Sequence, residues 1–172
     1  MAESIAHFAV KSIGLSRGNG RKPCTLLEAA RHNLREIQAE QGATGHIDPT
    51  RTHGNTVLHG PATAAEVCAQ AEALKAGAGI VCGSLRRDHC QAIEAVFSLP
   101  QLAAVPDPAD YFARCLAWLT GALALPVLSA VVHRDEAATH LHVLLLPVKE
   151  GAHVGSARID RAALKRLREH CF

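Results

Sequence analysis

The residues best suited to chemistry lie close together in the C-terminal half of the chain. They are three histidines and two carboxylates: His133, Asp135, Glu136, His140 and His142. Imidazole nitrogens and carboxylate oxygens are common protein ligands of divalent metals, so Zn, Mn, Co, Ni or Fe could bind such a set. Three histidines with Glu136 nearby therefore predict a divalent metal site.

Two apolar runs, residues 125–132 and 141–148, flank this cluster and predict two strands joined by a tight loop. His140 and His142 share a face because side chains alternate along a strand. In a hairpin, His133 would end the first strand opposite His140, so the three imidazoles would converge. The second strand is otherwise almost wholly apolar, which predicts burial and a need for partners. A hairpin with solvated histidines is the alternative.

Length and composition favour a single globular domain over residues 1–172. The sequence has 172 residues, of which 48% are hydrophobic and 20% charged. No apolar run is long enough to span a membrane, and no basic region followed by an apolar region opens the chain. The cysteines form no C-x-x-C pair, so buried free thiols are expected rather than disulfides or a zinc finger. These features predict a cytoplasmic protein.

The net charge of +2 gives only weak support for a nucleic-acid partner, but the charge is unevenly placed. Residues 11–35 carry one acid, Glu28, against a basic cluster of Lys11, Arg17, Arg21, Lys22, Arg31 and Arg35. Such a cluster can bind phosphates, although runs of charged residues usually lie on a solvent-exposed surface without a partner.

The rest of the pattern alternates strands and helices. Strands are expected over residues 4–13, 55–59, 92–99, 125–132 and 141–148, and helices from residues 25, 63, 108 and 161. Capping boxes at Thr25–Glu28 and Thr63–Glu66 open two of the helices. This order predicts an α+β fold, one sheet with helices packed on it, in which the histidine hairpin is the only evident hairpin.

The first helix has a predicted inward stripe of Leu27, Ala30, Leu34 and Ile37. His32 falls on the opposite side of this helix. Periodicity alone predicts that it is a surface histidine.

Several stretches resemble motifs of the Mob/Pre (MobV) family of plasmid mobilisation relaxases, which are HUH-type, metal-dependent enzymes. His133-x-Asp135-Glu136-x-x-x-His140-x-His142 is similar to the family signature H-x-D-E-x-x-x-H-x-H. Arg31-His32-Asn33 followed by Arg35 resembles the N-terminal H-N-x-R-type motif. Residues 46–55 resemble N-P-S-R-S-H-x-N, with Asp48 where Asn is common, and residues 84–88 resemble an R-K-D segment.

The resemblance implies an HUH-relaxase-like fold, with a single mostly antiparallel sheet and the metal histidines on its central strands. It implies site-specific nicking and strand transfer on single-stranded DNA at a plasmid transfer origin. His32 would be the nucleophile and form a covalent histidine–DNA intermediate, with Glu136 and Arg35 as further catalytic residues. Asp135 would orient a ligand histidine. The cofactor would be a divalent ion, with Mn expected and Mg, Zn, Co or Ni as alternatives.

The basic cluster and the resemblance together give a set of expected DNA-binding residues: Arg17, Arg21, Lys22, Arg31, Arg51, His53, Arg86 and Arg87. Three features depart from the family. Residues 154–158 lack the lysine of a Ser-x-Lys motif, the overall basicity is modest, and the chain ends at Phe172. Family members continue into a C-terminal region that would carry dimerisation or membrane association.

Two other functions fit the same residues. One is a DNA-binding relative without nicking activity, and the other is a metalloenzyme with two histidines and a carboxylate that acts on a small molecule. A tyrosine nucleophile is disfavoured. The single tyrosine, Tyr111, precedes the histidine pair, whereas HUH replication initiators place theirs after it, and Tyr111 lies on a predicted core face.

Overall fold

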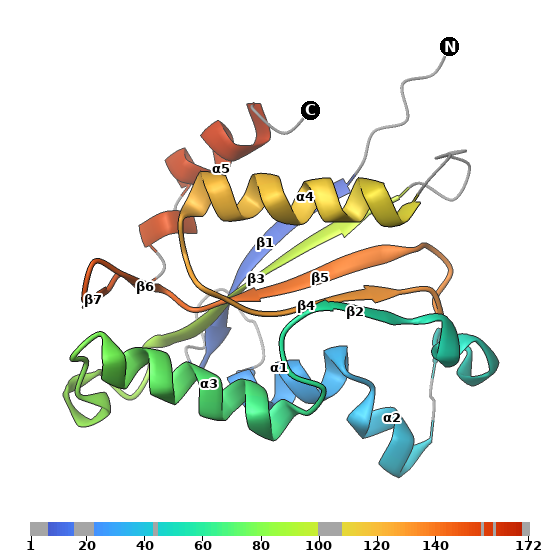
Figure 1. Ribbon diagram of the computed structural model, residues 1–172, viewed down its shortest axis with the longest axis horizontal. Coiled ribbons are helices and arrows are strands. Elements are labelled where there is room, and N and C mark those ends of the chain that lie inside the picture. Colours follow the sequence, from blue (N-terminus) through green and yellow to red (C-terminus); the bar gives the residue numbers. More distant parts are fainter. Residues whose placement is uncertain are drawn as a thin grey trace.

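The computed structural model describes residues 7–15, 23–42, 45–99, 108–155, 157–159 and 161–169, which form both helices and strands (Figure 1). The strands are β1 (His7–Gly14), β2 (Thr56–His59), β3 (Cys90–Ser98), β4 (Val127–His133), β5 (His140–Leu145), β6 (Val148–Lys149) and β7 (Ala152–His153). The α-helices are α1 (Leu26–Asn33), α2 (Glu36–Gln41), α3 (Ala64–Gly77), α4 (Pro108–Leu123) and α5 (Arg161–Glu169). Short 3₁₀ helices cover Pro49–Gly54, Cys82–Ser84 and Ala157–Ile159.

Five strands form one sheet in the order β1-β3-β5-β4-β2, and every neighbouring pair is antiparallel. The predicted histidine hairpin is β4–β5, and β5 is the central strand, so the predicted fold class is confirmed. One expectation was wrong, because β6 and β7 form a second, two-residue hairpin. Two paired residues on each side are too short for an alternating pattern to be visible in the sequence.

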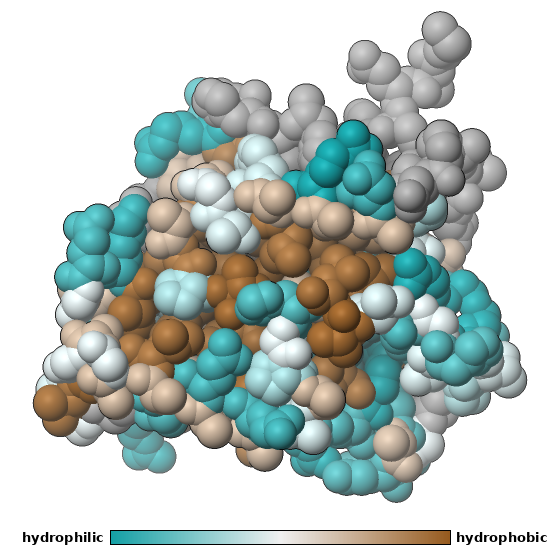
Figure 2. All heavy atoms as spheres, viewed as in Figure 1, coloured by the Kyte–Doolittle hydropathy of each residue, from teal (hydrophilic) through white to brown (hydrophobic). Residues whose placement is uncertain are grey.

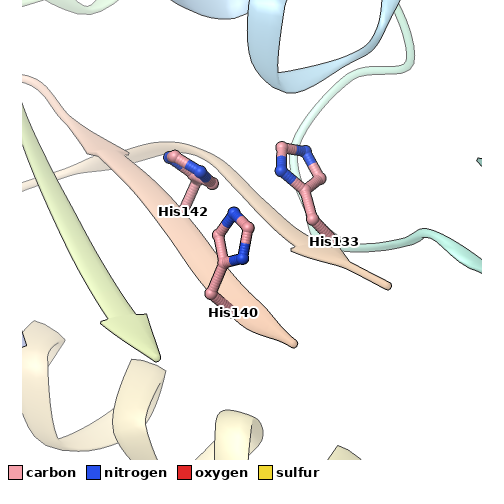
Figure 3. Close-up of side chains that lie close together, drawn as sticks. All are labelled: His133, His140 and His142. Carbon is pink, nitrogen blue, oxygen red and sulfur yellow. The ribbon is translucent and has the colours of Figure 1, made fainter. Parts of the chain in front are cut away.

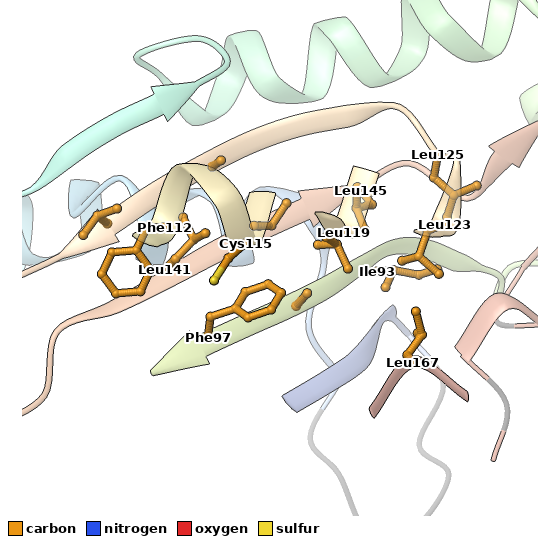
Figure 4. Packing of buried hydrophobic residues seen from close by; sticks show 14 of the residues in the cluster. Ile93, Phe97, Phe112, Cys115, Leu119, Leu123, Leu125, Leu141, Leu145 and Leu167 are labelled. Atoms are coloured by element: carbon orange, nitrogen blue, oxygen red, sulfur yellow. The ribbon is translucent and has the colours of Figure 1, made fainter. Parts of the chain in front are cut away.

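Helices cover both faces of the sheet, with α4 on one face and α1 and α3 on the other (Figure 1). Leu141, Val143 and Leu145 of β5 pack with α4, where Phe112, Cys115 and Leu119 are fully buried (Figure 4). The next residue along β5, Leu144, packs with the opposite cluster beneath α1 and α3. Apolar residues gather between α4 and α3 in the same view (Figure 2). Both faces therefore contribute to the core.

Helix α1 begins as predicted, because Thr25 and Glu28 form a reciprocal capping box. The predicted inward stripe was correct for Ala30, which is fully buried, and for Leu34, which packs against the core, but wrong for Leu27. The buried residues are Leu26, Ala29, Ala30 and Asn33, whereas Leu27 is 45% exposed. The stripe assumed a continuous helix to Ile37, but α1 ends at Asn33 and Arg35 takes a left-handed conformation with φ 61° before α2 begins. The small side chains of Ala29 and Ala30 let the helix pack close to the sheet.

Two further expectations can be compared with the described residues. Cys24, Cys68, Cys90 and Cys115 are free cysteines, as predicted for them, but only Cys115 is fully buried. Within the same part of the chain, no helix is both long enough and apolar enough to cross a membrane.

Candidate active site

The three histidines of the β4–β5 hairpin converge on the face of the sheet that carries α1 (Figure 3). His133 is paired directly with His140, and His142 shares the strand face of His140. The ring centroids are 5.2 Å apart for His133 and His140, 4.7 Å for His133 and His142, and 4.8 Å for His140 and His142. One ring nitrogen from each histidine lies within 4.8 Å of the others. This is the arrangement that the hairpin predicted, and we call it the histidine triad.

Each triad imidazole donates one ring N–H to a fixed acceptor. The pairs are His133 Nε2 to the Asn33 carbonyl (2.7 Å), His140 Nδ1 to the Ala138 carbonyl (2.8 Å) and His142 Nδ1 to Glu94 Oε1 (2.8 Å). Carbonyl and carboxylate oxygens only accept, so these nitrogens carry the hydrogens. The lone pairs then reside on His133 Nδ1, His140 Nε2 and His142 Nε2.

This donor set fits a divalent metal ion. His133 Nδ1 is buried and has no hydrogen-bond partner among the described residues, so its lone pair is available to a metal ion. Burial, reinforced by the nearby His142, lowers the pKa of His133 to about 3. Burial also lowers the pKa of His140. Metals bind the neutral imidazole, so His133 and His140 are in their ligating form at neutral pH.

Glu94 on β3 supports the triad and was missed from the sequence. It is 3% exposed and accepts hydrogen bonds from His142 and from Asn33 Nδ2 (3.1 Å), while Lys11 Nζ lies 2.7 Å from its other oxygen. Burial opposes its ionisation, but the bonds from His142 and Lys11 bring the pKa of Glu94 to about 2. A single carboxylate in the apolar run of residues 92–97 was the signal that could have found it.

The predicted role of Asp135 was wrong. Asp135 is fully buried, and among the described residues its carboxylate forms no hydrogen bond to a histidine, although it lies within 4.8 Å of a ring nitrogen of His133. Instead it accepts from Arg35 Nε (2.9 Å) and Nη2 (2.7 Å), Thr52 Oγ1 (3.0 Å) and Asn55 Nδ2 (2.7 Å). Burial alone would raise the pKa of Asp135, but these bonds hold it well below its usual range. Asp135 therefore joins the turn after α1, the 3₁₀ segment and the hairpin loop.

Arg35 is 5% exposed and lies between two carboxylates, with Nη2 2.7 Å from Asp135 Oδ1 and 2.7 Å from Glu136 Oε1. A second group of metal-type side chains, His133 with Asp135 and Glu136, has ligand atoms within 4.8 Å of one another. The guanidinium already supplies the cation there, so the histidine triad is the better metal site. A catalytic contact of Arg35 with phosphate stays a prediction.

Glu136 borders the triad. Its Oε2 lies 3.9 Å from His140 Nε2 and 3.2 Å from His46 Nε2. This position fits a carboxylate that binds the ion directly or through water. His46 is an exposed neighbour that the sequence did not single out.

His32 faces the triad, and its predicted exposed position was wrong. The residue is half-buried, with its ring centroid 6.5 Å from that of His133 and 6.3 Å from that of His142. Burial, followed by the positive charge of Arg35, lowers the pKa of His32. The imidazole is therefore neutral at neutral pH and has a lone pair that could attack an electrophile.

The expected DNA-binding residues are spread over the molecule. Arg51 and His53 lie exposed in the 3₁₀ helix beside the hairpin loop, where Arg51 Nη1 donates to the Glu136 carbonyl at 3.3 Å. Arg31 is paired with Glu36 and Glu40. Arg86, paired with Asp88, and Arg87 precede β3 at the end away from the triad, because Ser98 at its other end is paired with His140. Arg17, Arg21 and Lys22 lie outside the described residues.

A histidine triad on an antiparallel sheet, with His133 and His140 buried and a neutral fourth histidine on the covering helix, defines a candidate metal-dependent nucleophilic site of the HUH class. The family model Mob_Pre, described as plasmid recombination enzyme, matches residues 17–171, and the chain belongs to this family. The predicted resemblance is therefore confirmed. A search of curated proteins finds no match.

Solved structures of the MobM relaxase domain (MOBV; Mob_Pre) share the fold. One, Mn-bound and in complex with 22 nucleotides of plasmid pMV158 oriT DNA at pH 5.5, has a TM-score of 0.75 and 19% identity, over 96% of this chain and 83% of that chain. Another, bound to 26 nucleotides of the same oriT DNA, has a TM-score of 0.69 and 14% identity, over 98% of this chain and 83% of that chain. The predicted HUH-relaxase-like fold is confirmed.

Proposed function

We propose that this protein is a metal-dependent relaxase that nicks and rejoins single-stranded DNA at a plasmid transfer origin through a covalent bond to His32. Its place of action would be the cytoplasm, where plasmid DNA lies. Family membership and the fold shared with oriT-bound, Mn-bound relaxase domains support the class of reaction. Association of copies through a C-terminal region stays a prediction from the resemblance.

The observation that carries the proposal is the neutral imidazole of His32 facing the triad. Its ring is about equally distant from two triad rings, at 6.5 Å and 6.3 Å. His32 and the triad could therefore contact the same phosphate. Its lowered pKa favours the form that can attack.

The chemistry is an in-line displacement at phosphorus. The lone pair of His32 forms a P–N bond to the 5′ phosphate while the bond to the 3′ oxygen breaks, and the released oxygen takes a proton. The histidine–phosphorus bond retains the energy of the ester, so a 3′ hydroxyl can later reverse the reaction without ATP. A bound divalent ion would neutralise charge on the non-bridging oxygens.

The residues around the triad have supporting roles in this proposal. His133, His140 and His142 would hold the ion, and Glu136 would add a carboxylate beside them. Arg51, exposed and bonded to the Glu136 carbonyl, is the described arginine best placed for a DNA phosphate near the site. Mn is the expected ion because the related relaxase domains are Mn-bound.

The test is incubation of the protein with Mn and a set of labelled single-stranded fragments from plasmid transfer origins. A covalent protein–DNA band that carries the nucleotide on His32 is expected. DNA binding without any adduct would instead favour a DNA-binding relative that has lost nicking. Metal binding with neither DNA binding nor an adduct would favour a small-molecule metalloenzyme.

A further inference from the structure

The last residue of α1 contacts both sides of the histidine triad. Asn33 is 2% exposed, and its backbone carbonyl accepts from His133 Nε2 at 2.7 Å. Its side-chain Nδ2 donates to Glu94 Oε1 at 3.1 Å. The same oxygen of Glu94 accepts from His142 Nδ1 at 2.8 Å. Asn33 therefore reaches His133 directly and His142 through Glu94.

Packing does not explain an asparagine at this position. The other inward residues of α1 are Leu26, Ala29 and Ala30. An apolar side chain would fill the site without burying an amide against a carboxylate, an arrangement that is costly unless each group is hydrogen-bonded. The polar contacts lead instead to the two histidines whose other nitrogens face the metal position. Partners of this kind orient metal ligands.

We propose that Asn33 is a positioning residue that fixes the imidazole of His32 relative to the triad before DNA binds. His32 is its chain neighbour, so a helix end held by His133 and Glu94 also holds the attacking ring. Arg35 anchors the chain on the other side through Asp135 and Glu136. This inference rests on the proposed function, because the distance between ring and triad affects the reaction only if His32 attacks a phosphate bound there.

The substitution Asn33→Leu keeps the size and the backbone carbonyl but removes the donor to Glu94. Loss of a residue that supports a metal ligand lowers affinity by about 10-fold or more, so calorimetry with Mn²⁺ alone should show that weakening. A nucleophile that is no longer held in place should lower kcat for adduct formation by about 100-fold, with KM for DNA unchanged. Asn33→Ser, whose shorter side chain withdraws from Glu94, serves if Asn33→Leu does not fold.

Leu26→Ala is the matched control, because Leu26 lies on the same buried helix face without a contact to the triad. It should lower thermal stability and leave Mn²⁺ affinity unchanged. A double-mutant cycle with Glu94→Gln should show that Asn33→Leu costs less when the carboxylate is already gone.

Unchanged Mn²⁺ affinity and kcat in Asn33→Leu would overturn the proposal. So would an equal loss of Mn²⁺ affinity in Leu26→Ala, or full additivity with Glu94→Gln. If the unmodified protein forms no adduct, the proposed function fails. The Mn²⁺ measurements then still decide whether Asn33 positions the triad.

Discussion

The same strands present apolar side chains on one face of the sheet and the polar side chains of the site on the other. Toward α4, β5 presents Leu141, Val143 and Leu145, all fully buried in an apolar cluster. Toward α1, the same strand presents His140 and His142. Neighbouring residues alternate between faces, so substitutions one position apart can test one face at a time.

The difference shows how the protein separates stability from chemistry. Burial of polar groups is unfavourable unless they are paired, and the face beneath α1 pairs most of them through Glu94, Asn33, Arg35 and Asp135. Asn33 Oδ1 and Arg35 Nη1 are buried there without a hydrogen-bond partner among the described residues. The buried His133 Nδ1 is a described triad nitrogen without a partner. The α4 face contributes packing, so it can hold the sheet together whether or not a metal is bound.

The largest expected effect is on adduct formation, and it distinguishes the two candidate nucleophiles, His32 and Tyr111, which lie on opposite faces of the sheet. His32→Ala should reduce adduct formation by at least about a thousand-fold, because it removes the attacking atom. Tyr111→Phe should leave it unchanged, because Tyr111 lies on α4 and packs with the apolar cluster across the sheet. Mass spectrometry of the trapped adduct identifies the modified residue. The P–N bond should be acid-labile and survive alkali. A nucleotide on Tyr111, or an adduct in His32→Ala, would contradict this assignment.

The next effect concerns the metal. His140→Ala and His142→Ala should each lower Mn²⁺ affinity by more than the roughly 10- to 100-fold attributed to supporting residues. The control is His153→Ala, because His153 and His89 have ring centroids 5.4 Å apart without forming part of a described three-ligand group. Calorimetry compares the three variants. Equal affinity in His142→Ala and His153→Ala would mean that the triad is not the metal site.

On the α4 face, Leu141→Ala should lower the free energy of unfolding by about 2–5 kcal/mol through loss of apolar contact and a cavity. Leu141 is fully buried beside His142, yet it points to the other face. Urea denaturation of the metal-free protein measures the change, and calorimetry should show unaltered Mn²⁺ affinity in the folded variant. A large loss of affinity would mean that the two faces are energetically coupled.

The hairpin and its triad could be predicted because their signals are local. Strand alternation places His140 and His142 together, and a short loop places His133 opposite them. The fold class followed from the order of apolar runs, and the family motifs added His32. These predictions depend on residues close in sequence or on a fixed signature.

The parts that were missed depend on contacts between distant residues. Glu94 reaches His142 only because β3 pairs with β5, and Asp135 pairs with Arg35 only because the chain turns at a left-handed residue. Because α1 ends earlier than predicted, the face of the helix that packs inward also differs from the predicted face. Pairing of strands and the exact end of a helix are decided by tertiary contacts, which periodicity does not contain.

A smaller effect is the response of the metal-free protein to pH. His133 has its pKa lowered from 6.5 to about 3, so between these values the unfolded chain binds a proton that the folded protein does not. Stability should therefore fall as pH decreases from about 6.5 to 3. Glu94, lowered from 4.5 to about 2, should add a loss below about 4.5. Urea denaturation across pH measures both losses of stability. His133→Leu should flatten the dependence of stability on pH between about 4.5 and 6.5. An equally steep dependence over that range in the variant would contradict the assignment.

The smallest effect tests which side of the molecule meets DNA. Arg51→Gln should weaken binding of single-stranded DNA and reduce the slope of log affinity against log salt by about 0.7, the value for one phosphate contact. Arg51 is exposed and bonded to the Glu136 carbonyl beside the triad. Arg114 is a matched arginine on α4, where it is 70% exposed and 3.1 Å from Asp110. Arg114→Gln should leave the slope unchanged. A reduced slope in Arg114→Gln, with none in Arg51→Gln, would place the DNA against α4 and away from His32.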